Sequence, residues 1–199
     1  MTPARMAAFT DGVVAIIITI MVLELPLPKA ATPAALLAMA PIFLAYALSY
    51  ANVGLYWANH HHLLHLTERV DGRVLWANLF LLFWLSLVPF IIRWLDETGF
   101  ASLPTAGYGV VLGMAAIGYI LTQQAIIACN GGKNSALAKA LGRDVKGKAS
   151  LIFYIAAIPT ALFQPWLAIA LYVTVSAIWL VPDRRIERRL KEPGSDPVQ

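Results

Sequence analysis

Long runs of apolar residues with few charges between them limit most strongly what this chain can fold into. Apolar residues make up 59% of the sequence and charged residues 13%, against roughly 45 to 50% and about 25% in ordinary soluble domains. Lipid offers the backbone no hydrogen-bond partner, so a segment that crosses about 30 Å of hydrocarbon has to be a helix of around 20 apolar residues. The sequence therefore predicts an all-α integral membrane protein.

Six segments meet this requirement, and we expect six transmembrane helices in one subunit. The expected spans are residues 6–25, 34–57, 74–94, 108–129, 149–163 and 166–181. The last two are short, and Gln164 with Pro165 is expected to form a tight hairpin between them. Residues 1–183 thus make one six-helix unit, followed by a tail at 184–199 that is first basic and then, by its composition, disordered.

The distribution of basic residues predicts that both termini lie in the cytoplasm. Lys and Arg are retained on the cytoplasmic side during insertion, and with the N-terminus inside, 13 of the 15 basic residues fall in cytoplasmic segments. Lys29 and Arg93 then lie outside. Because these charges sit at helix ends, anionic headgroups are their nearest partners, and we expect membrane lipids rather than nucleic acid to bind there.

The first span has two different faces when it is read at helical periodicity. At about 100° per residue, a sector of roughly 100° contains an apolar stripe with one hydroxyl. The stripe consists of Ile16, Thr19, Ile20 and Leu23. Asp11 lies about 140° away from Ile16. Taken alone, such a stripe is most often a lipid contact or a helix-packing surface.

Polar side chains at membrane depth are costly and are therefore candidates for function. Asp11 is not tolerable facing lipid, so we expect it to meet partners inside the protein, among Arg5, the histidines of the second span and Asn78. At base rates, an acid with such partners belongs more often to a structural network than to a proton relay or a catalytic dyad. We favour the structural interpretation.

Two further motifs are similar to functional sites but lack the context that such sites need. His61 and His65, in a cluster with His60 and His62, have a spacing that suits one metal ion, yet no His-Glu-x-x-His pattern is present. A polar interfacial belt with Trp57 is the favoured interpretation. The run Thr-Ala-Gly-Tyr-Gly at 105–109 is similar to a carbonyl-lined ion filter, but no pore helix precedes it.

The start of the chain carries the signature of a known family. Arg5 is followed by Phe9-Thr10-Asp11 and by an isoleucine-rich run at 15–20. This pattern resembles the Arg-x-x-x-Phe-Ser-Asp motif of the transmembrane protein 175 family, the lysosomal and bacterial potassium channels. Thr10 replaces the usual serine and keeps its hydroxyl. Trp57 with the histidines, and Trp-Ala-Asn-Leu at 76–79, also resemble bacterial members, so the resemblance covers roughly the first half of the chain.

The resemblance implies a homotetramer with a central pore lined by four copies of the first span. Bacterial members of the family carry one six-helix repeat and assemble as tetramers, whereas animal members carry two repeats and assemble as dimers. Ile16 would form the narrowest hydrophobic ring, with Ile20 and Leu23 as further rings toward the outside and Thr19 as a hydroxyl ring near the ion path.

The resemblance also implies a network that holds the first span against the second and third. Its expected members are Arg5, Phe9, Thr10, Asp11, His60, His61 and Asn78. In this role Asp11 points away from the pore stripe, in agreement with the angles given above.

We therefore expect a potassium channel of a bacterial inner membrane, with passive, moderately potassium-selective cation flux through a hydrophobic constriction. We expect no enzymatic activity, no cofactor and no metal other than potassium ions in transit. One alternative is a secondary transporter that binds a small polar or ionic substrate at Gln123 or Gln124, although neither inverted repeats nor broken helices are evident. A second alternative is a membrane metalloenzyme or haem protein built on the histidine cluster.

Overall fold

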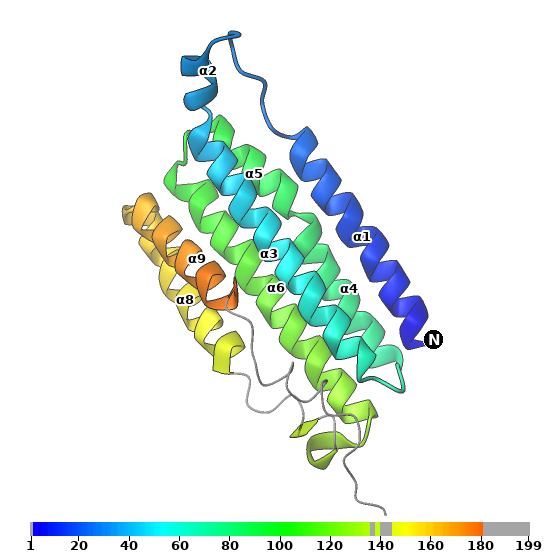
Figure 1. Cartoon of the computed structure of the whole chain (residues 1–199). Helices are drawn as coiled ribbons and strands as arrows, with labels where there is room; N and C mark the ends of the chain where they lie inside the picture. The colour runs from blue at the N-terminus through cyan, green and yellow to red at the C-terminus, as the bar shows by residue number, and fades with distance from the viewer. Residues whose placement is uncertain (1, 136–137, 140–144, 181–199) are drawn as a thin grey trace, which may run out of the picture.

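The computed structural model describes residues 2–135, 138–139 and 145–180, and the regular elements within them are all helical (Figure 1). The helices are α1 (Pro3–Leu23), α2 (Pro33–Leu37), α3 (Ala40–His65), α4 (Gly72–Ser86), α5 (Val88–Glu97), α6 (Ser102–Cys129), the 3-10 turn η1 (Gly132–Asn134), α8 (Val145–Phe163) and α9 (Pro165–Leu180). The tail expected at 184–199 lies outside the described residues.

The long helix α6 is central, with α4 and α5 on one side of it and α8 and α9 on the side away from α1 (Figure 1). One apolar core runs from α1 through α4, α5 and α6 to the α8–α9 hairpin. The backbones of α4 and α6 approach closely at Gly118, where an added Cβ would lie 2.8 Å from Leu81 Cα. A small residue is therefore required at this crossing.

Helix α1 runs parallel to the α4–α5 pair in a nearly constant register. In its first half, Asn78 Nδ2 donates to Thr10 Oγ1 at 3.0 Å, and these residues are 68 apart in sequence. At its end, Arg93 Nη1 lies 2.9 Å from Glu24 Oε2, and these residues are 69 apart. Each residue of α1 thus lies at about the same height as the residue 68 positions later.

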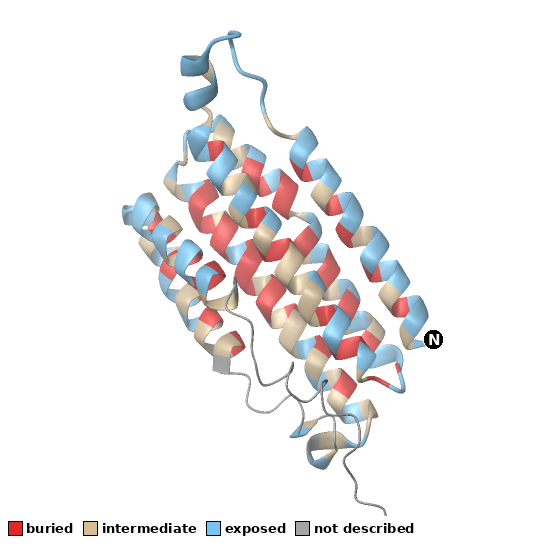
Figure 2. Ribbon diagram, viewed as in Figure 1, coloured by how far each residue is buried: buried red, intermediate tan, exposed pale blue. Residues whose placement is uncertain are grey.

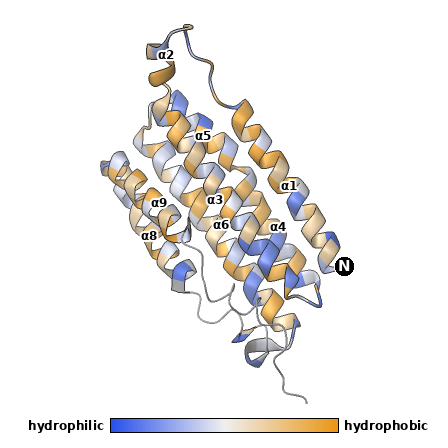
Figure 3. Cartoon of the chain, in the orientation of Figure 1, coloured by the Kyte–Doolittle hydropathy of each residue, from blue (hydrophilic) through white to orange (hydrophobic). Residues whose placement is uncertain are grey.

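The position of α1 is peripheral. Its buried residues form one stripe, consisting of Met6, Thr10, Val14, Ile17 and Met21. The rest of its circumference is mostly exposed, as the pale blue stretches of the α1 ribbon in Figure 2 show. Since the exposed side is also largely apolar (Figure 3), α1 is a helix with two apolar faces and one intramolecular contact surface.

The observed helices differ from the predicted spans in their bounds: α6 begins at Ser102 rather than at 108, for example, and α8 at Val145 rather than at 149. The span expected at 34–57 begins at Ala40 as α3 and continues to His65, so the histidines lie within the helix. The span expected at 74–94 is divided at Leu87 into α4 and α5, because Pro89 has no N–H to donate to the preceding turn. The turn at Leu87 interrupts this span, although Gly72–Glu97 as a whole is long and apolar enough to cross a membrane. The expected hairpin at Gln164 is confirmed, since that residue alone separates α8 from α9.

Three helical segments of the described chain are long and apolar enough to cross a membrane: Pro3–Leu23, Gly72–Glu97 and Ser102–Cys129. Ala149–Phe163 and Pro165–Trp179 are shorter apolar helices. Helix α3 has 26 residues, but its second half is polar. Hydrophilic residues gather at the lower ends of α3 and α4 (Figure 3). By length and composition the chain is a helical membrane protein.

We predict that Gly118→Ala destabilises the protein. The new methyl group would meet the Leu81 backbone, which cannot move aside as a flexible side chain can. Overpacking of this kind costs about 1 to 3 kcal/mol. Thermal unfolding in detergent, followed by tryptophan fluorescence, measures the effect. Gly54→Ala is the matched control, because nothing lies within 4 Å of its added Cβ. Equal midpoints for the two variants would contradict the prediction.

Candidate functional site

A buried hydrogen-bonded chain links three helices at Asn78. Its Nδ2 donates to Thr10 Oγ1 on α1 at 3.0 Å, and its Oδ1 lies 2.9 Å from His60 Nε2 on α3. Because a carbonyl oxygen can only accept, His60 has to donate through Nε2. All three side chains are at most 2% exposed. The structure thus brings together Thr10, His60 and Asn78 of the expected network.

The Asp11 carboxylate lies outside this buried chain. Its Oδ1 accepts a hydrogen bond from Trp57 Nε1 at 2.8 Å, and both residues are exposed in the isolated subunit. The sequence predicts Arg5, a histidine or Asn78 as its partner, whereas the observed donor is Trp57. Arg5 and Phe9 are also exposed, and the Arg5 guanidinium forms no hydrogen bond within the described part of the chain. Trp57 was visible in the sequence, but no spacing rule pairs it with a residue of the first span.

The remaining histidines form an aromatic ladder with Trp57 on the exposed side of α3. The ring centroids of Trp57 and His61 are 5.9 Å apart, and those of His61 and His65 are 4.6 Å apart. Among the described residues there is no group of three potential metal ligands. The ladder is thus separate from the buried chain that His60 joins.

The apolar stripe of α1 is exposed. The exposed fractions are 59% for Ile16, 40% for Ile20 and 80% for Leu23, whereas Ile17, next to Ile16, is 3% exposed. The Thr19 hydroxyl donates to the Ile16 carbonyl at 2.9 Å. Its oxygen lone pairs therefore stay free to accept from, or coordinate, a group outside the helix.

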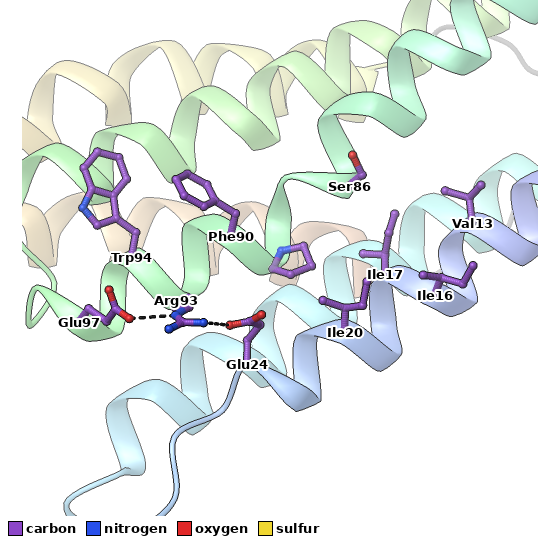
Figure 4. A pocket seen from close by; sticks show the side chains of 11 residues that line it. Val13, Ile16, Ile17, Ile20, Glu24, Ser86, Phe90, Arg93, Trp94 and Glu97 are labelled. Atoms are coloured by element: carbon purple, nitrogen blue, oxygen red, sulfur yellow. Dashed lines mark hydrogen bonds and ion pairs between the residues drawn. The ribbon is translucent and has the colours of Figure 1, made fainter.

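One edge of this stripe borders a cavity of about 760 Å³ between α1 and the α4–α5 pair (Figure 4). Val13, Ile16, Ile17 and Ile20 line one wall. The opposite wall is formed by Ser86, Pro89, Phe90 and Trp94. The cavity is thus mostly apolar and opens beside the stripe.

An ion-pair cluster closes one end of the cavity (Figure 4). Arg93 Nη1 lies 2.9 Å from Glu24 and its Nε lies 2.8 Å from Glu97 Oε1. Arg93 thereby joins the C-cap of α1 to the last turn of α5. The sequence offered the Arg93–Glu97 spacing of four as a signal, but nothing that pointed to Glu24.

The other candidate motifs take ordinary structural positions. Residues 105–109 are part of α6, so their carbonyls do not line a loop, and Thr105 O accepts from Tyr172 at 3.1 Å. Gln123 is half-buried and Gln124 is exposed, and neither has a hydrogen-bond partner among the described side chains. The structure therefore does not bring them together as a substrate site.

We predict that Asn78→Ala destabilises the protein, because it leaves buried groups of Thr10 and His60 without their partner. The expected loss is about 1 to 3 kcal/mol, measured as a lower unfolding midpoint in detergent. Gln124→Ala, which removes an exposed amide, is the control. A variant as stable as the control would mean that the Thr10–Asn78–His60 hydrogen bonds do not hold α1.

We predict that Arg93→Gln loosens the end of α1. Hydrogen exchange at residues 20–25 should become a few times faster, and no more, since exposed ion pairs contribute little. Arg93→Lys should restore part of the protection, and Lys29→Gln should leave it unchanged. Unaltered exchange in Arg93→Gln would show that packing alone fixes this end.

Comparison with known proteins identifies the family. The family model for the endosomal/lysosomal potassium channel TMEM175 matches residues 5–89. A potassium channel of Chryseobacterium sp. (strain P1-3) is 50% identical over 192 residues, which cover 96% of this chain and all of that relative. The human endosomal/lysosomal proton channel TMEM175 is 40% identical over 92 residues, or 40% of this chain and 18% of that protein.

A solved structure agrees with the fold. The crystal structure of a lysosomal potassium-selective channel TMEM175 homolog from Chamaesiphon minutus superposes with a TM-score of 0.77 at 24% identity, covering 92% of this chain and 97% of that one. The nearly full-length relative and the match over α1, α3 and α4 lead to one conclusion. This chain belongs to the endosomal/lysosomal potassium channel TMEM175 family.

Proposed function

We propose that this protein is the subunit of a homotetrameric channel that passes potassium ions down their gradient. The observation that carries the proposal is the exposed apolar stripe of α1, because α1 has a buried face and still leaves Ile16, Ile20 and Leu23 uncovered. Four such helices around a central axis would place this stripe on the ion path. The name of the Chryseobacterium relative, a potassium channel, supports the choice of ion.

In this arrangement six segments cross the membrane: α1, α3, the α4–α5 pair, α6, α8 and α9. Both termini are cytoplasmic, and the C-terminal one includes the tail at 184–199. The membrane is the inner membrane of a bacterium. Basic residues at the cytoplasmic ends bind anionic lipid headgroups. Helix α3 tolerates His60 at membrane depth because this side chain is buried and paired with Asn78.

Conduction is limited by a ring of four Ile16 side chains. A narrow apolar ring does not stabilise a water column, so it blocks ions until it widens and becomes wet. Ile20 and Leu23 extend the apolar section outward. Each Thr19 hydroxyl donates its proton to the Ile16 carbonyl, so its oxygen presents lone pairs to a partly dehydrated cation. The Thr10–Asn78–His60 chain holds α1 in place from behind.

The direct test is ion flux into liposomes that contain the purified protein. Opposed potassium and sodium gradients should give a reversal potential shifted toward that of potassium. Flux that saturates and is coupled to a second solute would identify a transporter instead. A reversal potential that follows only the pH gradient would identify a proton channel, as the human relative is named.

We predict that Ile16→Asn raises conductance and lowers the preference for potassium, because an amide ring stays hydrated where an isoleucine ring does not. Conductance should rise severalfold in planar bilayers, with the reversal potential moving toward zero. Ile155→Asn is the matched control, since Ile155 on α8 is 62% exposed, like Ile16 at 59%, but lies away from α1. Unchanged conductance and selectivity in Ile16→Asn would remove this residue from the ion path.

A further inference from the structure

An exposed aromatic stripe runs along α4 and α5. Trp76, Phe83 and Phe90 are spaced by seven residues, and their exposed fractions are 75%, 56% and 62%. Residues seven apart in a continuous helix drift by only about 20°, so Trp76 and Phe83 project from one side of α4. Phe90 follows on α5, after the break at Leu87. This stripe lies next to the cavity, since Phe90 lines its wall (Figure 4).

A stripe with the same spacing but small side chains runs along α1. Ala8, Ala15 and Val22 are also spaced by seven residues and are all exposed. Asp11 lies within the same sector of about 60°. This flank of α1 faces roughly away from Val13 and Ile17, which line the cavity. Within one subunit the small residues therefore point away from the α4–α5 pair.

The two stripes match in height. The Thr10–Asn78 bond joins residues 68 apart, and the Glu24–Arg93 ion pair joins residues 69 apart. With an offset of 68, Ala8 lies level with Trp76, Ala15 with Phe83 and Val22 with Phe90. Rotation about an axis along the membrane normal preserves height, so the same levels coincide between neighbouring subunits of a ring.

We infer that the Trp76, Phe83 and Phe90 stripe of one subunit packs on the Ala8, Ala15 and Val22 stripe of the next copy of this chain. This inference rests on the proposed homotetramer. If the Ile16 face points to the axis, the small-residue flank meets one neighbour and the α4–α5 side meets the other. Small residues let a neighbouring helix approach closely, and large rings fill the space that they leave.

Charge complementarity favours this partner over lipid. Asp11 is exposed between Ala8 and Ala15, with the Trp57 N–H as its hydrogen-bond donor. A carboxylate at membrane depth needs further donors. The neighbouring stripe brings the exposed indole N–H of Trp76, which lies three residues, or about 4.5 Å, from the level of Asp11. Acyl chains offer no donor, so a second copy completes the surroundings of Asp11.

Cysteine cross-linking of the full-length protein in membranes tests the register. In a Cys129→Ser background, which removes the single native cysteine, the double variants Ala15→Cys/Phe83→Cys and Ala8→Cys/Trp76→Cys should each form a ladder up to a covalent tetramer on oxidation. Co-assembled chains that carry only Ala15→Cys or only Phe83→Cys should form dimers and nothing larger, because each contact joins two different stripes.

Two control pairs make the test specific. Ala8→Cys/Phe83→Cys is displaced by one heptad, or about 10 Å, and Ala15→Cys/Ile155→Cys involves the exposed surface of α8. Neither should cross-link beyond background. If the substitutions of one matched pair prevent assembly, the other matched pair, which lies at a different height, tests the inferred interface.

Native mass spectrometry of the unsubstituted protein separates this inference from the proposed assembly. A tetramer in which the matched pairs fail, or cross-link no better than the displaced pair, would overturn the inferred interface and leave the tetrameric channel intact. A monomer would overturn both.

Discussion

Asn78 is held between two helices, because its amide N–H donates to Thr10 on α1 while its carbonyl oxygen accepts from His60 on α3. In lipid there is no hydrophobic force that drives apolar helices together, so packing and polar contacts decide where a helix sits. Helix α1 has apolar residues on all sides, and the buried Thr10 distinguishes the side that faces the bundle. The rotation of α1 about its axis follows from that bond.

This rotation determines everything that α1 presents to its surroundings. With Thr10 turned inward, Ile16 and Leu23 are uncovered, the cavity lies on one side of them and the small-residue flank with Asp11 lies on the other. The Arg93–Glu24 ion pair fixes the far end of the same helix. Two anchors of nearly equal sequence offset keep α1 and the α4–α5 pair in register over their full length.

The sequence was sufficient to predict the helical class, the α8–α9 hairpin and the division of α1 into two faces, because these depend on local composition and on helical periodicity. It was not sufficient for the break at Leu87 or for the extension of α3 to His65, since tertiary packing decides whether a proline bends a span and whether polar residues stay helical. The Asp11–Trp57 bond joins residues far apart in sequence. No periodicity encodes such a pair.

The inferred interface and the proposed constriction are neighbours in the chain, since Ala15 is followed directly by Ile16. A shift of the Phe83 ring against Ala15 in the adjacent subunit would move Ile16 toward or away from the axis. Because an apolar constriction gates by dewetting, repacking at the interface that changes the width of the Ile16 ring would alter conduction. Assembly and gating would then depend on the same contact, and the buried hydrogen bonds behind α1 would supply the fixed point against which it moves.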